Sequence, residues 1–340
     1  MSFRLNTYRF IRPLLFQLAP ETAHKFTLTL LNTAYRCKLI KPKIYKGSGI
    51  KILDMQFPNR VGLAAGFDRN GEYIDALSTL GFGFIEIGSV TPKPQPGKPK
   101  PRIFRLPTQH ALINRVGFAS KGVDYVLGQL KKTKYRGILG INIGKNLDTP
   151  TEHAIDDYII CMQKLYPYAN YLTINVSSPN TEGLRDLQQQ NHLYQLLSTL
   201  KAEQHILTGR HHRYVPLFVK LSPDLDEKQI AEIAEVIQMC KVDGIIITNT
   251  SLQRPLPEDC KHKDEQGGLS GRPITELSLK VLQNFTKQLK HDIPIIALGG
   301  IYDEKSAYDR IASGASLFQV YTGLIYQGPK LIKKLATFMQ

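Results

Sequence analysis

Residues 138–180 have the sequence ILGINIGKNLDTPTEHAIDDYIICMQKLYPYANYLTINVSSPN, and this stretch decides the fold class. Its two apolar runs, Ile138–Ile143 and Tyr171–Val176, have the length of buried strands. Between them, His153–Leu165 carries apolar residues at helical spacing. A strand, a helix and a strand in this order predict a βαβ unit whose two strands lie parallel in one sheet.

The same alternation extends in both directions along the chain of 340 residues. Apolar runs predict strands at Val61–Ala65, Phe84–Gly88, Ile138–Ile143, Tyr171–Val176, Val215–Leu221, Gly244–Thr248, Pro294–Leu298 and Leu317–Tyr321. Helices are predicted at Tyr73–Leu80, His153–Leu165, Leu193–Lys201, Lys228–Met239, Ile274–Leu289, Lys305–Ala312 and Lys330–Phe338. Eight such strands predict an α/β protein with a closed (β/α)8 TIM barrel instead of an open sheet. The long loops Thr91–Leu112 and Pro255–Gly271 are expected to be lids or binding loops.

The chain before the barrel predicts two helices. Apolar residues recur at helical spacing at Phe10, Ile11, Leu14, Leu15 and Leu18, and again at Ala23, Phe26, Leu30 and Ala34. Their polar side carries Arg4, Arg9, Arg12 and Lys25, a pattern that suits either a helical cap on the barrel or a pair lying on an anionic membrane. With the Lys-, Pro- and Gly-rich linker 38–49, we expect a helical domain at 1–41 and a barrel domain at 42–340. No run approaches the roughly 18 apolar residues of a spanning helix, and no convincing signal-peptide cleavage site follows the basic start, so we expect the mature chain to begin here.

The formal net charge of +15 favours an anionic partner, which could be nucleic acid, a lipid surface or a small acidic ligand. The basic residues are spread along the chain without a long Lys/Arg run, so nucleic acid is not the partner that we expect. The four cysteines lie far apart and near no His cluster. We therefore expect neither a metal site nor a disulfide framework, and a reducing cytoplasm fits.

Polar residues close most of the predicted strands, and a barrel forms its active site at these carboxyl ends. The candidate positions are Ala64–Arg69, Ser89, Asn142–Asn146, Asn175–Asn180, Lys220, Thr248–Thr250, Gly299–Gly300 and Tyr321–Gly323. A single Asn at a strand end is most often a turn former. Several amides on one rim, with few carboxylates, suit a planar heterocycle better than a hydrolytic or metal site.

Three of these positions allow more than one interpretation. The glycines of Gly299–Gly300 and Tyr321–Gly323 follow the last two strands, where they either bind a ligand phosphate or only permit turns. Lys220 suits an aldolase Schiff base, a fixed cation beside a flavin, or a solvated lysine on the rim. The hydroxyls of Ser177 and Ser178 lie in a sequence that is typical of a turn, and no G-x-S-x-G elbow supports a hydrolase triad.

Nine strings, in chain order, resemble the class 2, quinone-dependent dihydroorotate dehydrogenase family. They are AAGFD, EIGSVTP, PRIFRL, INRVGF, GINIGKN, NVSSPNT, TNT, GGLSGRP and GASLFQVYTG. The resemblance runs from about residue 10 to the end. It implies the oxidation of (S)-dihydroorotate to orotate in de novo pyrimidine (UMP) biosynthesis, with FMN as cofactor and a membrane quinone as electron acceptor.

The resemblance also implies which residues bind each ligand. The implied FMN contacts are Ala65, Gly66, Phe67, Asp68, Arg69, Ser89, Asn142, Asn175, Lys220, Thr248, Gly271, Gly300, Tyr321 and Thr322. The implied substrate contacts are Arg69, Asn114, Arg115, Val116, Gly117, Phe118, Asn175, Asn180, Asn249 and Thr250. Ser178 is implied as the base that takes the proton from ring carbon 5 while a hydride leaves ring carbon 6 for the flavin. Class 1 members have Cys at this position, so Ser supports class 2.

For the N-terminal helices the resemblance implies a funnel that admits quinone from the bilayer, with His24, Arg105 and Tyr321 at its polar end. The implied protein is a monomer or weak homodimer bound peripherally to the cytoplasmic side of a bacterial inner membrane. The chain departs from the family pattern at Arg69, where Lys is usual, and at Ala119-Ser120, where Asn is usual. Because Arg and Lys are not interchangeable at a tight site, we expect altered contacts there.

Three alternatives stay open at this point. One is another flavin barrel, with a different pyrimidine substrate or a soluble acceptor. A second is a flavin-free aldolase that uses Lys220. The third is a basic protein without enzymatic activity that binds nucleic acid or lipid.

Overall fold

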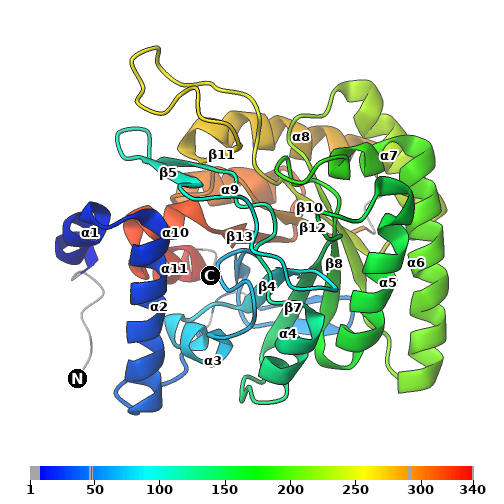
Figure 1. Ribbon diagram of the computed structural model, residues 1–340, viewed down its shortest axis with the longest axis horizontal. Helices are drawn as coiled ribbons and strands as arrows, with labels where there is room; N and C mark the ends of the chain where they lie inside the picture. The colour runs from blue at the N-terminus through cyan, green and yellow to red at the C-terminus, as the bar shows by residue number, and fades with distance from the viewer. Residues whose placement is uncertain (1–7, 46, 48, 290–292, 339–340) are drawn as a thin grey trace.

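A closed barrel of eight parallel strands forms the centre of the molecule, and each strand pairs with the next one along the chain (Figure 1). The computed structural model describes residues 8–45, 47, 49–289 and 293–338. The barrel strands are β3 (Val61–Leu63), β4 (Phe84–Val90), β7 (Ile138–Ile143), β8 (Tyr171–Asn175), β9 (Leu217–Leu221), β10 (Gly244–Ile247), β12 (Ile295–Ala297) and β13 (Leu317–Val320). All eight predicted strands and the (β/α)8 class are confirmed, and only the strand ends differ by a few residues.

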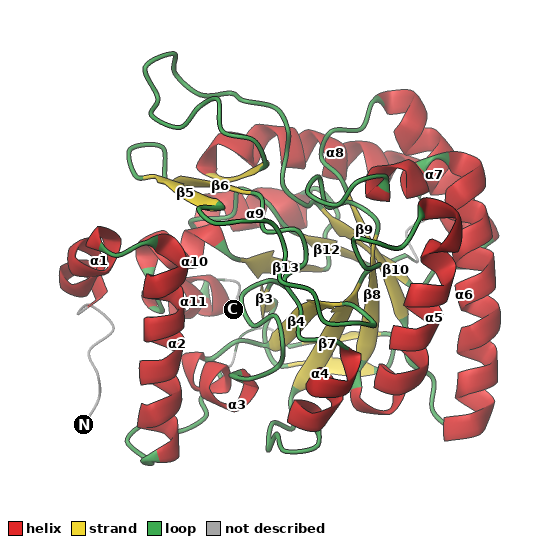
Figure 2. Cartoon of the chain, in the orientation of Figure 1, coloured by secondary structure: helices red, strands yellow, loops and turns green. Residues whose placement is uncertain are grey.

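Helices cover the outer face of the barrel (Figure 2). They are α3 (Ile74–Leu77), α4 (Val123–Leu130), α5 (Ala154–Leu165), α6 (Gln190–His211), α7 (Glu227–Met239), α8 (Thr275–Gln288), α9 (Glu304–Ala312), α10 (Thr322–Gln327) and α11 (Lys330–Thr337). Short 3-10 turns lie at Ser78–Leu80, Thr151–His153, Tyr166–Tyr168, Leu184–Gln188 and Arg272–Ile274. Every predicted helix occurs, whereas α4 and α10 were not expected and α6 is longer than its prediction.

Two of these helices begin with a reciprocal cap that fixes where they start. The Asp226 carboxylate accepts a hydrogen bond from the Gln229 N–H at 2.8 Å, and the Gln229 side chain accepts one from the Asp226 N–H at 3.0 Å. Asp303 and Ser306 form the same box at the start of α9. Each box satisfies backbone donors that the first helical turn leaves without partners.

The amino-terminal end of the barrel is closed by the antiparallel hairpin of β1 (Ile50–Ile52) and β2 (Met55–Phe57). The Phe57 ring packs edge to face on Phe84 at 5.3 Å, and Tyr171 packs on Phe218 at 5.1 Å inside the barrel. A Cβ atom at Gly140 would lie 2.1 Å from the Tyr171 ring, so the barrel needs a glycine there. These aromatic side chains fill the interior towards the amino-terminal end of the barrel, so the ligand site is expected at the carboxyl ends of the strands.

A three-stranded antiparallel sheet lies at that carboxyl end, formed by β5 (Ile103–Leu106), β6 (Ala111–Asn114) and β11 (Gly268–Gly271). It joins the two long segments that we expected to be lids or binding loops, so both contain ordered strands. Buried side chains of its own hold it together, among them Phe104, Ile113 and Leu269.

The two N-terminal helices, α1 (Tyr8–Gln17) and α2 (Pro20–Arg36), lie against one side of the barrel (Figure 1). Polar contacts attach them: Glu21 pairs with Arg102 at 2.9 Å, and Arg105 donates to the Leu18 carbonyl at 2.7 Å. Their other side leaves large apolar residues exposed, namely Phe10, Leu14, Leu18, Phe26 and Leu30. Within the described residues, no helix is both long and apolar enough to cross a membrane.

Candidate active site

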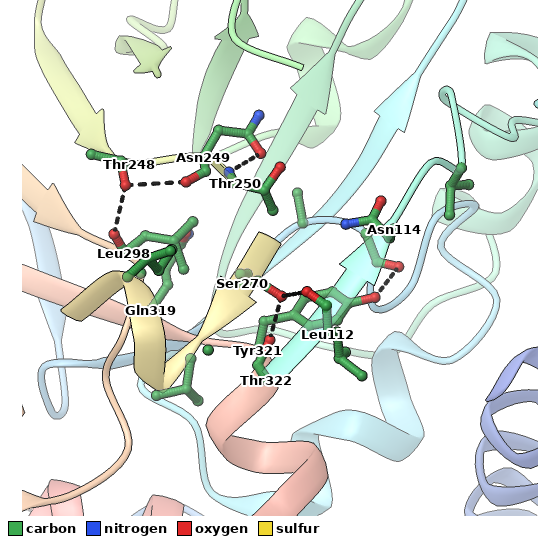
Figure 3. A pocket seen from close by; sticks show the side chains of 18 of the residues that line it. Leu112, Asn114, Thr248, Asn249, Thr250, Ser270, Leu298, Gln319, Tyr321 and Thr322 are labelled. Carbon is green, nitrogen blue, oxygen red and sulfur yellow. Dashed lines mark hydrogen bonds between the residues drawn. The ribbon is translucent and has the colours of Figure 1, made fainter. Parts of the chain in front are cut away.

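A cavity of about 180 Å³ lies at the carboxyl ends of the barrel strands, under the antiparallel sheet (Figure 3). Most residues singled out from the sequence line it. From the FMN set these are Ala65, Gly66, Arg69, Ser89, Asn175, Lys220, Thr248, Gly271, Gly300, Tyr321 and Thr322. From the substrate set they are Asn114, Val116, Gly117, Phe118, Asn180, Asn249 and Thr250, and Ser178 joins them.

The remaining predicted residues lie outside this lining. They are Phe67, Asp68, Asn142, Arg115, His24 and Arg105. The Asp68 carboxylate accepts hydrogen bonds from the N–H groups of Glu72 and Tyr73, and burial raises its pKa to about 6. The Arg115 guanidinium pairs with Glu265 at 2.6 Å, on the loop that precedes β11.

A network of buried amides forms the floor of the cavity. Asn142 donates to Glu86 Oε1 at 2.9 Å and accepts from Asn175 Nδ2 at 3.1 Å and from the Ser89 hydroxyl. Asn175 also donates to Ser89 Oγ at 3.0 Å. The other oxygen of Glu86 accepts from Tyr171 and Gln319, so both oxygens of this fully buried carboxylate are satisfied.

A second group of amides lies nearer the mouth of the cavity. Asn180 Nδ2 donates to the carbonyl of Asn114 at 3.1 Å. Asn249 Nδ2 donates to Ser177 Oγ at 3.1 Å. Asn249 Oδ1 accepts from the Thr250 N–H at 2.8 Å (Figure 3). These side chains come from different strand ends, which confirms that the rim brings the amides together as the order of strands predicted.

Lys220 is the next-to-last residue of β9 and is 5% exposed, yet no described residue accepts a hydrogen bond from its Nζ. Burial lowers the pKa of this ammonium group, and the carboxylate of Glu86 opposes that shift. A buried cation without a direct partner is costly in free energy. Its place in the lining makes it a candidate binding group for an anionic ligand.

The turn after β12 lines the same cavity, and it has backbone N–H groups without an acceptor among the described residues. Gly300 and Ile301 are buried, and neither N–H donates to any described residue. Gly300 has a φ of +69°, and a Cβ atom there would lie 2.4 Å from Thr275 Cα, so only glycine fits. Buried N–H groups without acceptors are rare in proteins, and two in succession suit an anion.

Ser178 also lines the cavity and is 6% exposed. Its Oγ accepts a hydrogen bond from the Asn180 N–H at 3.3 Å. Among the described residues, no His or carboxylate contacts this hydroxyl, so the arrangement does not form a hydrolase triad.

A chain of contacts leads from α2 to the cavity. The ring of His24 contacts the Phe67 carbonyl through Nε2 at 2.9 Å, and Phe67 packs edge to face on Tyr321 at 5.5 Å. Arg69, where the resemblance led us to expect Lys, lines the cavity and reaches Glu21 of α2 at 3.8 Å. The longer arginine thus connects the cavity to the N-terminal helices.

Sequence reasoning missed several residues that support the site. The sequence has one signal for Glu86, since it is the one carboxylate within an otherwise apolar strand, and this signal could have identified it as a functional residue. Arg185 donates to the carbonyls of Ser177 and Thr250 and pairs with Asp224 at 2.9 Å, but no local pattern indicates this contact. Ser270 hydrogen-bonds Thr322 at 2.8 Å (Figure 3).

Comparison with known proteins agrees with this geometry. Residues 49–340 match the family model described as dihydroorotate dehydrogenase. The chain belongs to the dihydroorotate dehydrogenase family. It is 51% identical to dihydroorotate dehydrogenase (quinone) of Acinetobacter baylyi, over 96% of this chain and 98% of that protein. The protein of the same name from Cellvibrio japonicus is 50% identical over 97% of both chains.

The fold agrees as well. A crystal structure of the dihydroorotate dehydrogenase of Eimeria tenella in complex with ferulenol is 38% identical and superposes with a TM-score of 0.87, over 95% of this chain and 93% of that one. The similarity confirms the expected membership of class 2, the quinone-dependent dihydroorotate dehydrogenases. An aldolase and a basic protein without enzymatic activity are excluded as alternatives.

His24 provides a pH test of how the N-terminal helices attach to this dihydroorotate dehydrogenase fold. Burial, helped by the nearby Arg69, lowers its pKa from 6.5 to about 4. Unfolding therefore takes up a proton between pH 6.5 and pH 4. The contribution of His24 to the free energy of unfolding is fully present above pH 6.5 and falls by ~3 kcal/mol as the pH drops to 4.

Urea unfolding of the wild type and of His24→Gln from pH 7.5 to 4 measures this effect, and the variant should show a smaller pH dependence. The raised pKa of Asp68 acts in both proteins and cancels in the comparison. The same pH dependence in both proteins would show that His24 does not titrate in this way.

Proposed function

We propose that the chain oxidises (S)-dihydroorotate to orotate, with FMN as cofactor and a membrane quinone as electron acceptor, in de novo pyrimidine biosynthesis. The observation that carries this proposal is the single cavity in which Lys220, the amide groups, Ser178 and the unpaired N–H groups of the β12 turn meet. The family is flavin-dependent, and the residues of this chain support FMN in particular.

The lining fits a flavin that bears a phosphate. The N–H groups of Gly300 and Ile301 have no acceptors among the described residues, and they would hold the phosphate together with the hydroxyl of Thr322. Lys220, Ser89 and Asn175 would hold the ring at the other end of the lining. When bound, FMN would supply the redox chemistry, as the acceptor of a hydride from ring carbon 6 of the substrate and the donor of electrons to quinone.

Lys220 contributes charge at this site. Because its ammonium group is buried without a hydrogen-bond acceptor, an anionic ligand offsets the cost of its burial. We infer that Lys220 stabilises the negative charge that the cofactor ring gains on reduction. The burial of Lys220 also keeps its charge away from water, in which the attraction between the ammonium group and the reduced ring would be weaker.

The amides near the mouth would bind the substrate. Dihydroorotate has an imide edge with both donors and acceptors, and Asn114, Asn180 and Asn249 provide both kinds of group. Thr250 and Arg69 also face the cavity, and Arg69 adds a cation suited to the carboxylate. Val116, Gly117 and Phe118 also line the cavity and would contact the bound substrate.

We infer that Ser178 is the base that removes the proton from ring carbon 5. Serine is a weak base in water, but here the hydroxyl is almost completely buried. The Asn180 N–H donates to its oxygen, which stabilises that oxygen when its own proton moves on to solvent.

Replacing Ser178 by Ala should slow reduction of the flavin by dihydroorotate about 10²- to 10⁴-fold, the usual contribution of a general base. FMN should stay bound, because the Ser178 side chain makes no hydrogen bond to Lys220 or to the β12 turn. Stopped-flow absorbance under anaerobic conditions measures the rate, and Ser198→Ala on the outer helix α6 is the matched control. Unchanged reduction by the Ser178 variant would remove it as the base.

The N-terminal helices would admit the membrane quinone that accepts the electrons. We infer that residues 1–41 form a membrane and quinone domain and residues 42–340 the catalytic domain, with the protein a monomer or weak homodimer on the cytoplasmic side of the bacterial inner membrane. The exposed apolar residues of α1 and α2 support this, because Phe10 and Leu14, and likewise Phe26 and Leu30, lie four residues apart on one face. From there His24, Arg105 and Tyr321 would line the polar end of the quinone path, and the contacts through Phe67 connect His24 with Tyr321.

The triple variant Leu14→Gln, Phe26→Gln, Leu30→Gln should lower binding to anionic phospholipid vesicles ~10-fold or more. The reason is that these three side chains would no longer transfer apolar surface from water into the membrane on binding. Turnover with long-chain quinone in those vesicles should fall, while turnover with a soluble artificial acceptor should not. The control carries Tyr194→Gln, Ile206→Gln and Met239→Gln, whose exposed side chains lie on other helices. An equal loss of both activities in the first variant would contradict a role at the membrane.

A further inference from the structure

Arg310 of α9 is the largest side chain that is almost completely buried, with 1% of its surface exposed. Its Nη2 donates to the Thr275 carbonyl at 2.7 Å, to Ser278 Oγ at 2.8 Å and to the Gly299 carbonyl at 3.1 Å. Its Nε and Nη1 atoms have no partner among the described residues. A guanidinium group therefore lies directly behind the β12 turn with part of its donor capacity unused.

No described carboxylate lies within ion-pair distance of this guanidinium. Burial lowers the pKa of Arg310 to about 10, and the more distant Glu276 and Asp309 oppose that shift. Asp309 pairs with Lys305 at 2.8 Å, and Glu276 lies at the exposed start of α8. An isolated buried charge is costly, so an anion from outside the chain would offset it.

The hydrogen bonds of Arg310 also orient the turn. Because C=O and N–H point in opposite directions across a trans peptide, holding the Gly299 carbonyl turns the Gly300 N–H away from Arg310. The Gly300 carbonyl is held in the same way by Thr275 Oγ1 at 3.0 Å, which turns away the Ile301 N–H. Gly299, Gly300 and Ile301 all line the cavity. The N–H groups of Gly300 and Ile301 have no acceptor among the described residues.

We propose that Arg310 is a positioning residue for the phosphate of the cofactor. It holds the Gly299–Gly300 turn so that consecutive N–H groups are directed away from it, and it places a positive charge behind the turn that favours a doubly ionised phosphate. The inference rests on the proposed function, because it takes the anion to be the phosphate of a flavin nucleotide.

Competition between FMN and riboflavin, which lacks the phosphate, tests Arg310 directly. The holoenzyme is equilibrated with an excess of both flavins in equal amounts, and chromatography of the bound flavin gives their ratio. In Arg310→Met the ratio of bound FMN to riboflavin should fall about 10- to 100-fold, the usual effect of losing hydrogen bonds from a charged donor. Arg310→Lys keeps the charge and should lose less of the preference.

Arg60→Met is the matched control, because Arg60 also donates to a backbone carbonyl, that of Ser316, but lies at the amino-terminal end of the barrel. The ratio of bound FMN to riboflavin in Arg60→Met should equal that of the wild type. An unchanged ratio in Arg310→Met would overturn the proposal, as would an equal weakening of both flavins. If Arg310→Met does not fold, Arg310→Lys provides the test: a ratio of bound FMN to riboflavin below that of the wild type supports the proposal, and a ratio equal to that of the wild type overturns it. A wild type that binds neither flavin would instead refute the proposed function.

Discussion

The buried carboxylate of Glu86 is the interaction on which the rest of the site depends. Inside the barrel it accepts hydrogen bonds from Asn142, Tyr171 and Gln319, which come from three different strands. A carboxylate in this position is tolerated only when its oxygens are satisfied, so the three donors have little freedom to move. Asn142 in turn fixes Asn175, whose Oδ1 accepts from Asn249 at 3.4 Å. The rigid amide rim is thus anchored to a charge in the core of the barrel.

Two cations with different surroundings complete this arrangement. Lys220 lies in the lining with no hydrogen-bond acceptor among the described residues, and Arg310 lies behind the β12 turn with two nitrogens unused. Burying each of these charges costs free energy, and the negative charge of the proposed ligand would offset that cost. A flavin nucleotide carries such charge at both of its ends, on the phosphate and on the reduced ring, so the proposed cofactor would match one cation in the lining and one behind it.

The sequence predicts the barrel well because its signals are local. Alternating strands and helices identified every barrel strand, and the rule that parallel strands end on one rim brought Asn175, Lys220 and Asn249 together. The antiparallel sheet was missed because β11 pairs with β6 from a distant part of the chain, and strands of four residues have little periodicity. The contacts of Glu86 and Arg310 depend on which strands become neighbours, so they could not be derived from spacing alone. The resemblance to a known family supplied the ligand roles, which the residue pattern by itself left open.

Anaerobic mixing of the purified protein with dihydroorotate is the most direct test of the central claim that the rim binds a reducible flavin beside its substrate. The protein should be yellow as isolated, lose the absorbance of oxidised flavin when dihydroorotate is added, and regain it when quinone is added. A colourless protein that takes up no FMN, or a flavin spectrum that dihydroorotate leaves unchanged, would contradict the account.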